Sequence, residues 1–156
     1  METLERILRE HRLLQGLPDE HVRFMVGCAR NVRYQPGQYL NREGDESTAM
    51  YLLREGRVAL EVHVPGRGVV QVDTLGAGDM VGWSWLVPPY RWEVDARAVE
   101  PVRALAFDCP CLREKMETDQ MLGYALAKRF LRELHQRLER VRMQRLDVYK
   151  AETAGA

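Results

Sequence analysis

The sequence predicts a mainly β domain with flanking helices, a β-roll of the jelly-roll type. Apolar residues follow a helical spacing at both ends of the 156-residue chain, they alternate with polar residues in the middle, and turn residues recur at close intervals between these segments. A chain of this length can bury one core without help from disulfides. We therefore expect N-terminal helices (1–31), a β core (32–108), C-terminal helices (109–150) and a disordered tail (151–156).

The N-terminal segment predicts two helices. Leu4, Ile7 and Leu8 lie close to helical spacing, and a Gly-Leu-Pro turn ends this first helix. The second helix is expected to begin at Asp19, directly after the proline, and to continue to about Arg30.

The middle of the chain predicts many short strands. Residues 58–64 alternate apolar and polar side chains, which is typical of a half-buried strand. The shorter segments 49–53 and 102–107 are more continuously apolar, as buried strands can be. Turns are marked by Pro36-Gly37, Gly44-Asp45, Glu55-Gly56, Pro65-Gly66, Gly76 with Gly78, and Pro88-Pro89. Short strands separated by such turns favour a roll or sandwich over a parallel α/β sheet.

The C-terminal segment predicts one long helix, from about Asp119 to Tyr149, which would be about 45 Å long. Apolar residues form a heptad seam along it, with a gap at Arg145: Leu131, Leu134, Leu138, Val141 and Val148. Because such a helix is longer than the domain it belongs to, we expect the seam to form a parallel coiled coil in a homodimer. The alternative is that the helix packs entirely on its own β domain.

The composition limits which binding partners and which cellular compartment we expect. Lysine plus arginine equals aspartate plus glutamate at 23 each, so the zero net charge shows no footprint for nucleic acid or an anionic membrane. No apolar run approaches the roughly 20 residues that span a bilayer, and the charged opening segment is no signal peptide. The odd number of cysteines favours a reducing compartment. We expect a soluble, cytoplasmic protein without membrane contact.

The cysteines suggest neither a metal site nor a redox cluster. Cys109 and Cys111 flank a proline, whereas zinc and iron–sulfur sites need about four ligands, with paired cysteines usually two residues apart. Cys28 is far upstream on a predicted helix. We therefore interpret Cys109 and Cys111 as incidental members of a helix-start turn and expect no bound metal.

Catalytic chemistry is not indicated either. His63 lies on the polar side of its strand, and His11, His21 and His135 lie among charges on helix faces, so we expect all four to be solvated. No nucleophile pairs with a histidine at a motif-like spacing, no Walker-type loop occurs, and no close pair of carboxylates stands out. We expect no enzymatic activity and no cofactor.

The segment GDMVGWSWLVPPYRW, residues 78–92, is the candidate ligand loop. It keeps turn glycines and crowds aromatic rings around one arginine; the candidate residues are Gly82, Trp83, Ser84, Trp85, Tyr90, Arg91 and Trp92. The rings could hold a planar or apolar ligand, fill the pocket themselves, or dock a partner protein. Arg91 could contact an anion or stack on a neighbouring ring.

Four segments together carry a resemblance to a known family: YQPGQYLNREGD (34–45), YLLREGRVALE (51–61), residues 78–82, and ARAVEPVRALAFD (96–108). With the helix–roll–helix order, they make the chain similar to the cyclic-nucleotide-binding domain, specifically to the sensor half of the cyclic AMP receptor protein (Crp/Fnr) family of bacterial regulators. The resemblance covers the chain as far as Tyr149 and implies a regulatory β-roll.

Two departures from the family pattern concern the ligand. Where such proteins place a glutamate that accepts a hydrogen bond from the ribose, this chain has Trp83, whose indole only donates. The place of the phosphate-binding arginine falls on Trp92, with Arg91 one residue early, and a shift by one residue reverses a side chain's face in a strand.

A third departure concerns DNA. Family regulators follow the long helix with a helix-turn-helix domain, whereas this chain stops six residues after Lys150. We therefore expect no direct DNA binding.

These observations favour a non-enzymatic regulatory or sensor module. It would act as a homodimer through a partner protein and would not bind cyclic AMP in the usual way, although an unidentified small molecule could occupy the loop of residues 82–92. The alternatives are a genuine cyclic AMP-binding regulator and a ligand-free dimeric adaptor.

Overall fold

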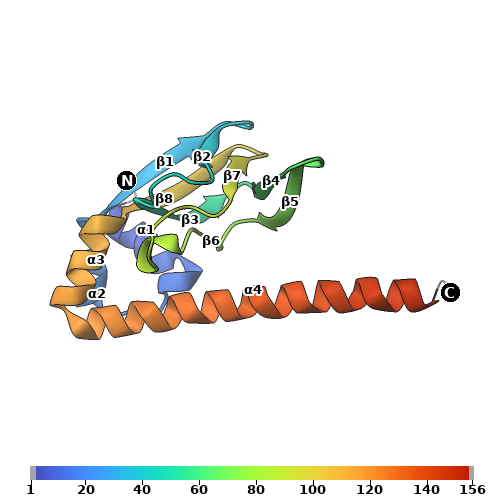
Figure 1. Ribbon diagram of the computed structural model, residues 1–156. Coiled ribbons are helices and arrows are strands. Elements are labelled where there is room, and N and C mark those ends of the chain that lie inside the picture. Colours follow the sequence, from blue (N-terminus) through green and yellow to red (C-terminus); the bar gives the residue numbers. More distant parts are fainter. Residues whose placement is uncertain (1–2, 155–156) are drawn as a thin grey trace.

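The structure is a computed structural model that describes residues 3–154 (Figure 1). In chain order the elements are α1 (Leu4–Glu10), the 3₁₀ turn η1 (Arg12–Leu14), α2 (Asp19–Val26), β1 (Ala29–Tyr34), β2 (Tyr39–Asn41), β3 (Ala49–Glu55), β4 (Val58–Val64), β5 (Gly68–Leu75), β6 (Met80–Val81), the 3₁₀ turn η2 (Ser84–Leu86), β7 (Asp95–Ala98), β8 (Val102–Asp108), α3 (Cys109–Thr118) and α4 (Gln120–Ala154).

The strands form the predicted roll. One antiparallel sheet has the order β1-β8-β3-β6 and the other has the order β2-β7-β4-β5. Helices α1, α2, α3 and the first part of α4 gather at one side of the roll, and α4 projects past it (Figure 1). The fold class expected from the sequence, mainly β with flanking helices, is therefore confirmed.

Two apolar cores explain why β3 and β8 are continuously apolar. Alternate residues of β3 and β8, such as Leu52 and Phe107, pack with the helices in one cluster. The residues between them, such as Leu53 and Ala106, pack inside the roll in a second cluster. Because both faces of these strands are covered, neither face carries the polar residues of a half-buried strand.

Strand β4 departs from its predicted alternation. Glu61 was expected on the polar side, but the structure buries it and pairs it with Arg97 of β7. Arg97 donates from Nε and Nη2 to the two carboxylate oxygens, at 2.8 and 3.0 Å. These hydrogen bonds hold the pKa of Glu61 below its usual value, because they outweigh the effect of burial. His63 is exposed, as expected.

Two histidines expected at the surface are buried instead, His11 and His21. His11 lies between α1 and η1, where its Nε2 donates to the carbonyl of Leu53 at 3.0 Å and its Nδ1 accepts from the amide of Leu13 at 3.2 Å. Burial lowers the pKa of His11, so this pattern belongs to a neutral imidazole. The charged neighbours in sequence therefore gave a wrong prediction for both residues.

Helix α4 begins one residue later than expected and continues through Ala154, so residues 151–154 are helical and do not form the disordered tail that we expected. Alanine and glutamate in this segment favour helix. At 35 residues the helix is about 52 Å long. Its first half buries Leu122, Leu126 and Phe130 against the domain, whereas every residue from 141 to 154 is exposed.

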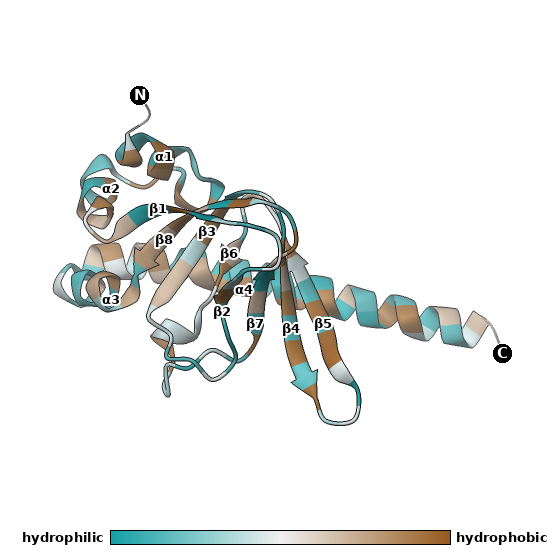
Figure 2. Cartoon of the chain, turned by 90° about the horizontal axis from the view of Figure 1, so that it is seen from above, coloured by the Kyte–Doolittle hydropathy of each residue, from teal (hydrophilic) through white to brown (hydrophobic). Residues whose placement is uncertain are grey.

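Figure 2 shows the same projection from above, with hydrophobic segments continuing along the free part of α4. Among residues 3–154, no helix combines the length and hydropathy needed to cross a bilayer.

Candidate functional site

Trp92 fills the interior of the roll next to Gly82. The indole is 5 % exposed and belongs to the cluster inside the sheets. Gly82 has a φ of +97°, and a Cβ built on it would overlap the Trp92 ring. Glycine is therefore required at position 82 both for its backbone conformation and for the close approach of the indole.

The loop holds Trp92 by backbone hydrogen bonds on both sides of the residue. Its amide donates to the carbonyl of Asp45 at 2.9 Å, and its carbonyl accepts from the amide of Gly44 at 2.8 Å. This pairing fixes the backbone of Trp92 in the framework of the roll, and the surrounding core residues pack against its ring.

Trp85 lies in the other core. It is fully buried in η2, and its ring meets Phe130 of α4 edge-to-face with centroids 5.7 Å apart. Two tryptophans seven residues apart thus enter two different apolar cores, and the loop between them connects the roll to the long helix.

Trp83 lies at the contact between the loop and α4. It is half-buried, and the guanidinium of Arg137 lies 5.0 Å from its ring centroid. Nη2 of Arg137 also donates to the carbonyl of Met80 in β6. Arg137 is 9 % exposed, and burial lowers its pKa. One arginine of α4 therefore contacts both the strand before the loop and the residue at the glutamate position.

Helix α3 fixes the far end of the loop. Arg113 donates to the carbonyl of Trp85 at 2.7 Å and places its guanidinium 4.6 Å from the Tyr90 ring centroid. Arg91, by contrast, is exposed and donates to the carbonyl of Gly44 at 3.3 Å. Ser84 is buried within η2. The described cations that stack on the loop's rings come from α3 and α4, not from Arg91.

The space left at the expected ligand position is very small. The cavity between Leu60, Gly82, Trp83, Trp92 and Val94 has a volume of about 10 Å³, which is about the space of one water molecule. Of the three interpretations of the aromatic cluster, this geometry fits rings that fill the pocket themselves. An exposed aromatic patch fits less well, because Trp85 and Trp92 are buried.

A cluster of polar residues, which was not predicted from the sequence, attaches α4 to the rest of the domain. Glu133, 6 % exposed, pairs with Arg12 of η1 at 2.8 Å, and Arg12 donates to the carbonyl of Gly78 at 2.9 Å. Arg129 donates to the carbonyls of Leu13 and Gln15. The spacing 126, 130, 133, 137 places Glu133 and Arg137 on the buried face of α4, which is a signal that the sequence did contain.

The predicted dimer residues lie mostly on the free face of α4. Four of the five are exposed, with exposed fractions of 67, 49, 48 and 58 % in this order: Leu131, Leu138, Val141 and Val148. The fifth, Leu134, is half-buried. Since the four exposed residues are spaced by 7, 3 and 7 residues, they lie along one stripe of the helix.

The cysteines correct two further expectations: Cys111 is not an incidental member of the helix-start turn, and Cys28 does not lie on a helix. Cys28 follows α2 and forms a disulfide with Cys111 in the first turn of α3. Cys28 was expected on a helix that continued to about Arg30, but α2 ends at Val26 and β1 pairs Ala29 with Phe107 of β8. This long-range pairing brings residues 28 and 111 together, and no local sequence pattern shows it. Among the described residues, no cluster of His, Cys, Asp and Glu could hold a metal ion.

Comparison with known proteins gives the same fold and family. Residues 31–119 match the model of the cyclic nucleotide-binding domain. Human cGMP-dependent protein kinase 2 is 29 % identical over 87 residues, which is 55 % of this chain and 11 % of the kinase. Human cyclic nucleotide-gated channel alpha-2 is 30 % identical over 134 residues, 85 % of this chain and 19 % of the channel. The chain thus spans less than a fifth of the length of these two relatives.

Solved structures from bacteria match most of the chain. A protein described as cyclic nucleotide-binding, from Geobacter metallireducens, has a TM-score of 0.79 at 27 % identity and covers 88 % of this chain and 99 % of its own. The catabolite activator protein of Thermus thermophilus has a TM-score of 0.66 at 23 % identity, with coverage of 85 and 62 %. Because the family model covers more than half of the chain, this protein belongs to the cyclic nucleotide-binding domain family, and its structural neighbours include Crp/Fnr regulators.

Proposed function

We propose that this protein is a non-enzymatic regulatory module that does not bind cyclic AMP in the usual way. The observation that carries the proposal is the Trp92 ring packed on Gly82 inside the roll. It leaves a cavity of about 10 Å³, whereas pockets for small ligands measure roughly 300–1,000 Å³. A nucleotide could enter only if the indole left its core position, so binding would carry the cost of exposing this ring.

The polar groups around the loop support the same conclusion. Trp83 offers a donor at the position where the family has an accepting glutamate. Arg91 lies on the outside of the loop, and Arg97 is engaged by the carboxylate of Glu61. None of these three side chains places a hydrogen-bond acceptor for a ribose, or a free guanidinium for a phosphate, in the cavity.

We propose that the module acts as a homodimer through α4. The stripe of Leu131, Leu138, Val141 and Val148 is exposed in a single copy and has heptad-like spacing. A second copy would cover it by the same residues, because a two-fold interface is self-complementary.

A partner protein would bind according to how the two α4 helices are arranged. Arg137 on Trp83 and Phe130 on Trp85 connect α4 to the loop, so we expect a displacement of the helix to move these loop residues as well. The closed pocket favours a ligand-free adaptor over a ligand-driven sensor. The cytoplasmic location expected from the sequence stays a prediction.

Isothermal titration calorimetry with cyclic AMP and cyclic GMP tests the closed pocket. We expect no heat of binding at nucleotide concentrations up to about 1 mM, which corresponds to less than about 4 kcal/mol of affinity. Micromolar binding of one nucleotide per chain would contradict the proposal. In that case the variant Arg91→Ala shows whether the exposed arginine turns inward to the phosphate, since it would then weaken binding tenfold or more.

A further inference from the structure

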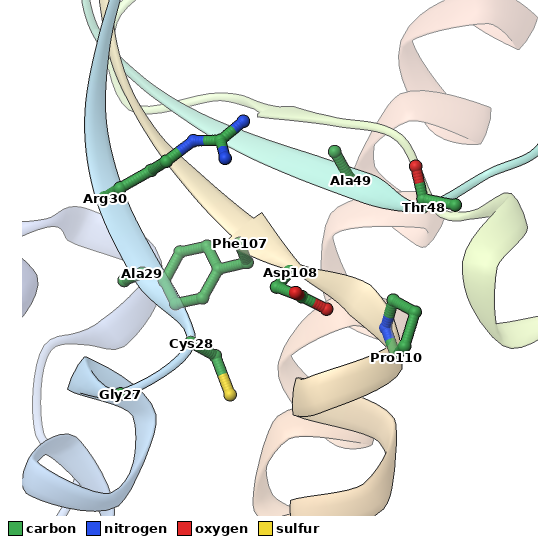
Figure 3. Close-up of a pocket in the computed structure, with 9 residues that line it drawn as sticks. All are labelled: Gly27, Cys28, Ala29, Arg30, Thr48, Ala49, Phe107, Asp108 and Pro110. Carbon is green, nitrogen blue, oxygen red and sulfur yellow. The ribbon is translucent and has the colours of Figure 1, made fainter.

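Cys28 of the Cys28–Cys111 disulfide lines a cavity in the domain. This cavity has a volume of about 400 Å³, and Cys28, Arg30, Thr48, Asp108 and Pro110 are among its lining residues. Figure 3 shows Arg30, Ala49 and Thr48 on one side of the cavity and Cys28, Asp108 and Pro110 on the other, with the Cys28 sulfur directed away from Arg30. The cavity is far larger than a water molecule and is large enough for a small thiol peptide.

The disulfide joins two helices that otherwise meet through weaker contacts. It ties the end of α2 to the first turn of α3, across 83 residues of sequence. Other polar contacts between these segments include Lys115 over the ring of Phe24 at 4.2 Å, His21 with Asp119 after α3 at 3.9 Å, and the amide of Asp108, which donates to the carbonyl of Cys28 at 2.8 Å. The covalent bond is thus the strongest single connection between the N-terminal helices and the α3–α4 segment.

The third cysteine is kept out of thiol exchange. Cys109 is fully buried, and its Sγ donates to the carbonyl of Phe107 at 3.7 Å. Burial raises the pKa of this thiol, so the reactive thiolate form is suppressed. The pair is therefore Cys28 with Cys111, although Cys109 is only two residues from Cys111.

We propose that Cys28 and Cys111 are a reversible redox pair that takes a small monothiol, of the glutathione class, in this cavity and locks α3 to α2 when oxidised. This site is independent of the ligand loop and of the function proposed above. The redox role rests on the reducing compartment expected from the sequence, where disulfides that persist are mostly redox-sensing or catalytic.

The exchange proceeds in two balanced steps. A thiolate entering the cavity attacks Sγ of Cys28, which lines it, and forms a mixed disulfide while Cys111 leaves as a thiolate. A second thiolate attacks the sulfur of the bound thiol, and Cys28 leaves. The protein disulfide gains two electrons and two protons, and the two small thiols become one disulfide.

Cys111 lies in the first turn of α3, and its amide donates to the carboxylate of the N-cap Asp108 at 3.0 Å. The helix N-terminus favours a thiolate at Cys111 and the charge of Asp108 opposes one, so these two effects do not decide which sulfur is attacked. Cys28 lines the cavity, although it is only 5 % exposed, and Cys111 is not among the lining residues. We therefore take Cys28 as the sulfur that is attacked and Cys111 as the sulfur that is released.

The test equilibrates the full chain in glutathione buffers of increasing reducing strength, followed by acid quench, alkylation after unfolding, and mass spectrometry. We expect one alkylated thiol under oxidising conditions and three under reducing conditions, with Cys28 carrying the mixed disulfide in between. Three alkylated cysteines in every buffer would overturn the proposal, because the disulfide would then not form. A single alkylated cysteine after the native protein is treated with excess reductant would also overturn it, because the disulfide would then not be reversible.

Two matched variants compare how readily a small thiol compound in the cavity reaches each of the two cysteines. With oxidised glutathione, Cys111→Ser should trap a mixed disulfide on Cys28 at least tenfold faster than Cys28→Ser traps one on Cys111. Equal rates, or the reverse order, contradict access through the cavity. Cys109→Ala should leave the redox transition of the other two cysteines in place; loss of that transition would assign the pairing to Cys109 instead.

The locking part of the proposal has its own measurement on the wild-type protein. Reduction should lower Tm by about 5–15 °C, since a disulfide that closes a long loop restricts the unfolded chain. It should also speed amide hydrogen exchange in α3 tenfold or more relative to the strands of the roll. Unchanged exchange in α3 with an unchanged Tm would show that the bond locks nothing.

Discussion

Single residues of the loop differ in what they do although they are chemically alike. Trp83, Trp85 and Trp92 stand within ten residues of each other, yet one contacts a helix arginine, one lies in the helical core and one fills the roll. Gly82 is the residue that makes room for the third ring. Substitutions at such positions should therefore be judged by the particular space each side chain occupies.

The variant Gly82→Ala tests the contact with Trp92. We expect the free energy of unfolding to fall by about 2–4 kcal/mol, since both the positive φ and the overlap of the new Cβ with the indole are costly. The measurement is urea denaturation followed by tryptophan fluorescence.

Gly37→Ala is the matched control for this variant. Gly37 has a φ of +92°, but a Cβ there would meet nothing within 4 Å. It should cost only about 1–2 kcal/mol for the backbone conformation. Equal losses for the two variants would mean that the Trp92 contact contributes nothing at position 82.

At the level of helices and strands, the packing of one element on another depends in part on polar residues buried between them. Helix α4 is attached by apolar side chains and also by Glu133, Arg129 and Arg137, which reach η1 and β6. These contacts differ in kind. Glu133 is a buried carboxylate with a cationic partner, whereas Arg137 is a buried cation that meets a carbonyl and a ring.

The variant Arg12→Met tests the first kind of contact. It removes the cation beside the Glu133 carboxylate, whose side chain is only 8 % exposed. We expect the free energy of unfolding to fall by about 1–3 kcal/mol, because a buried carboxylate without its hydrogen-bonding cation is costly. Thermal and urea unfolding at neutral pH measure this.

Arg137→Met is the comparison, because it removes the buried charge itself. Nη1 of Arg137 is buried without a hydrogen-bond partner, so removing this guanidinium also removes a desolvation cost that offsets the lost contacts. We expect a loss below about 1 kcal/mol. A larger loss for Arg137→Met than for Arg12→Met would show that the contacts to Met80 and Trp83 outweigh the cost of burying the guanidinium.

At the level of the whole molecule, the proposed homodimer depends on the free half of α4. No residue from 141 to 154 is covered in a single copy, and the helix projects beyond the roll in both views (Figures 1 and 2). Residues 141–154 contribute little to the stability of the domain, because they are not buried against it. We infer that its apolar stripe serves contact with a second copy.

Multi-angle light scattering of Leu138→Glu tests that assembly. We expect the wild-type protein to be a dimer. The dissociation constant of the variant dimer should be at least ten times higher, because a carboxylate would enter an apolar seam. Gln136→Glu is the matched control: it adds the same charge at another exposed position of α4, away from the stripe. A monomeric wild type, or equal effects of the two variants, would contradict a dimer through this stripe.

The amino-acid sequence by itself determined the kinds of elements and their order. Alternation, helical spacing and turn glycines report local geometry, so the helices, the strands and the roll were predicted without tertiary information. The motifs of residues 34–45, 51–61 and 96–108 also pointed to the family to which the chain belongs. Aromatic residues at the glutamate and arginine positions indicated that the ligand site had changed.

Only the tertiary structure decided what the chemically important side chains contact. His11 meets Leu53, Glu61 meets Arg97, Arg137 meets Met80, and Cys28 meets Cys111. In each pair the partners are at least 36 residues apart, and burial depends on such partners rather than on neighbours in sequence. The same reason separates the three tryptophans: local spacing places them in one loop, but two separate cores and a helix arginine determine where each ring lies.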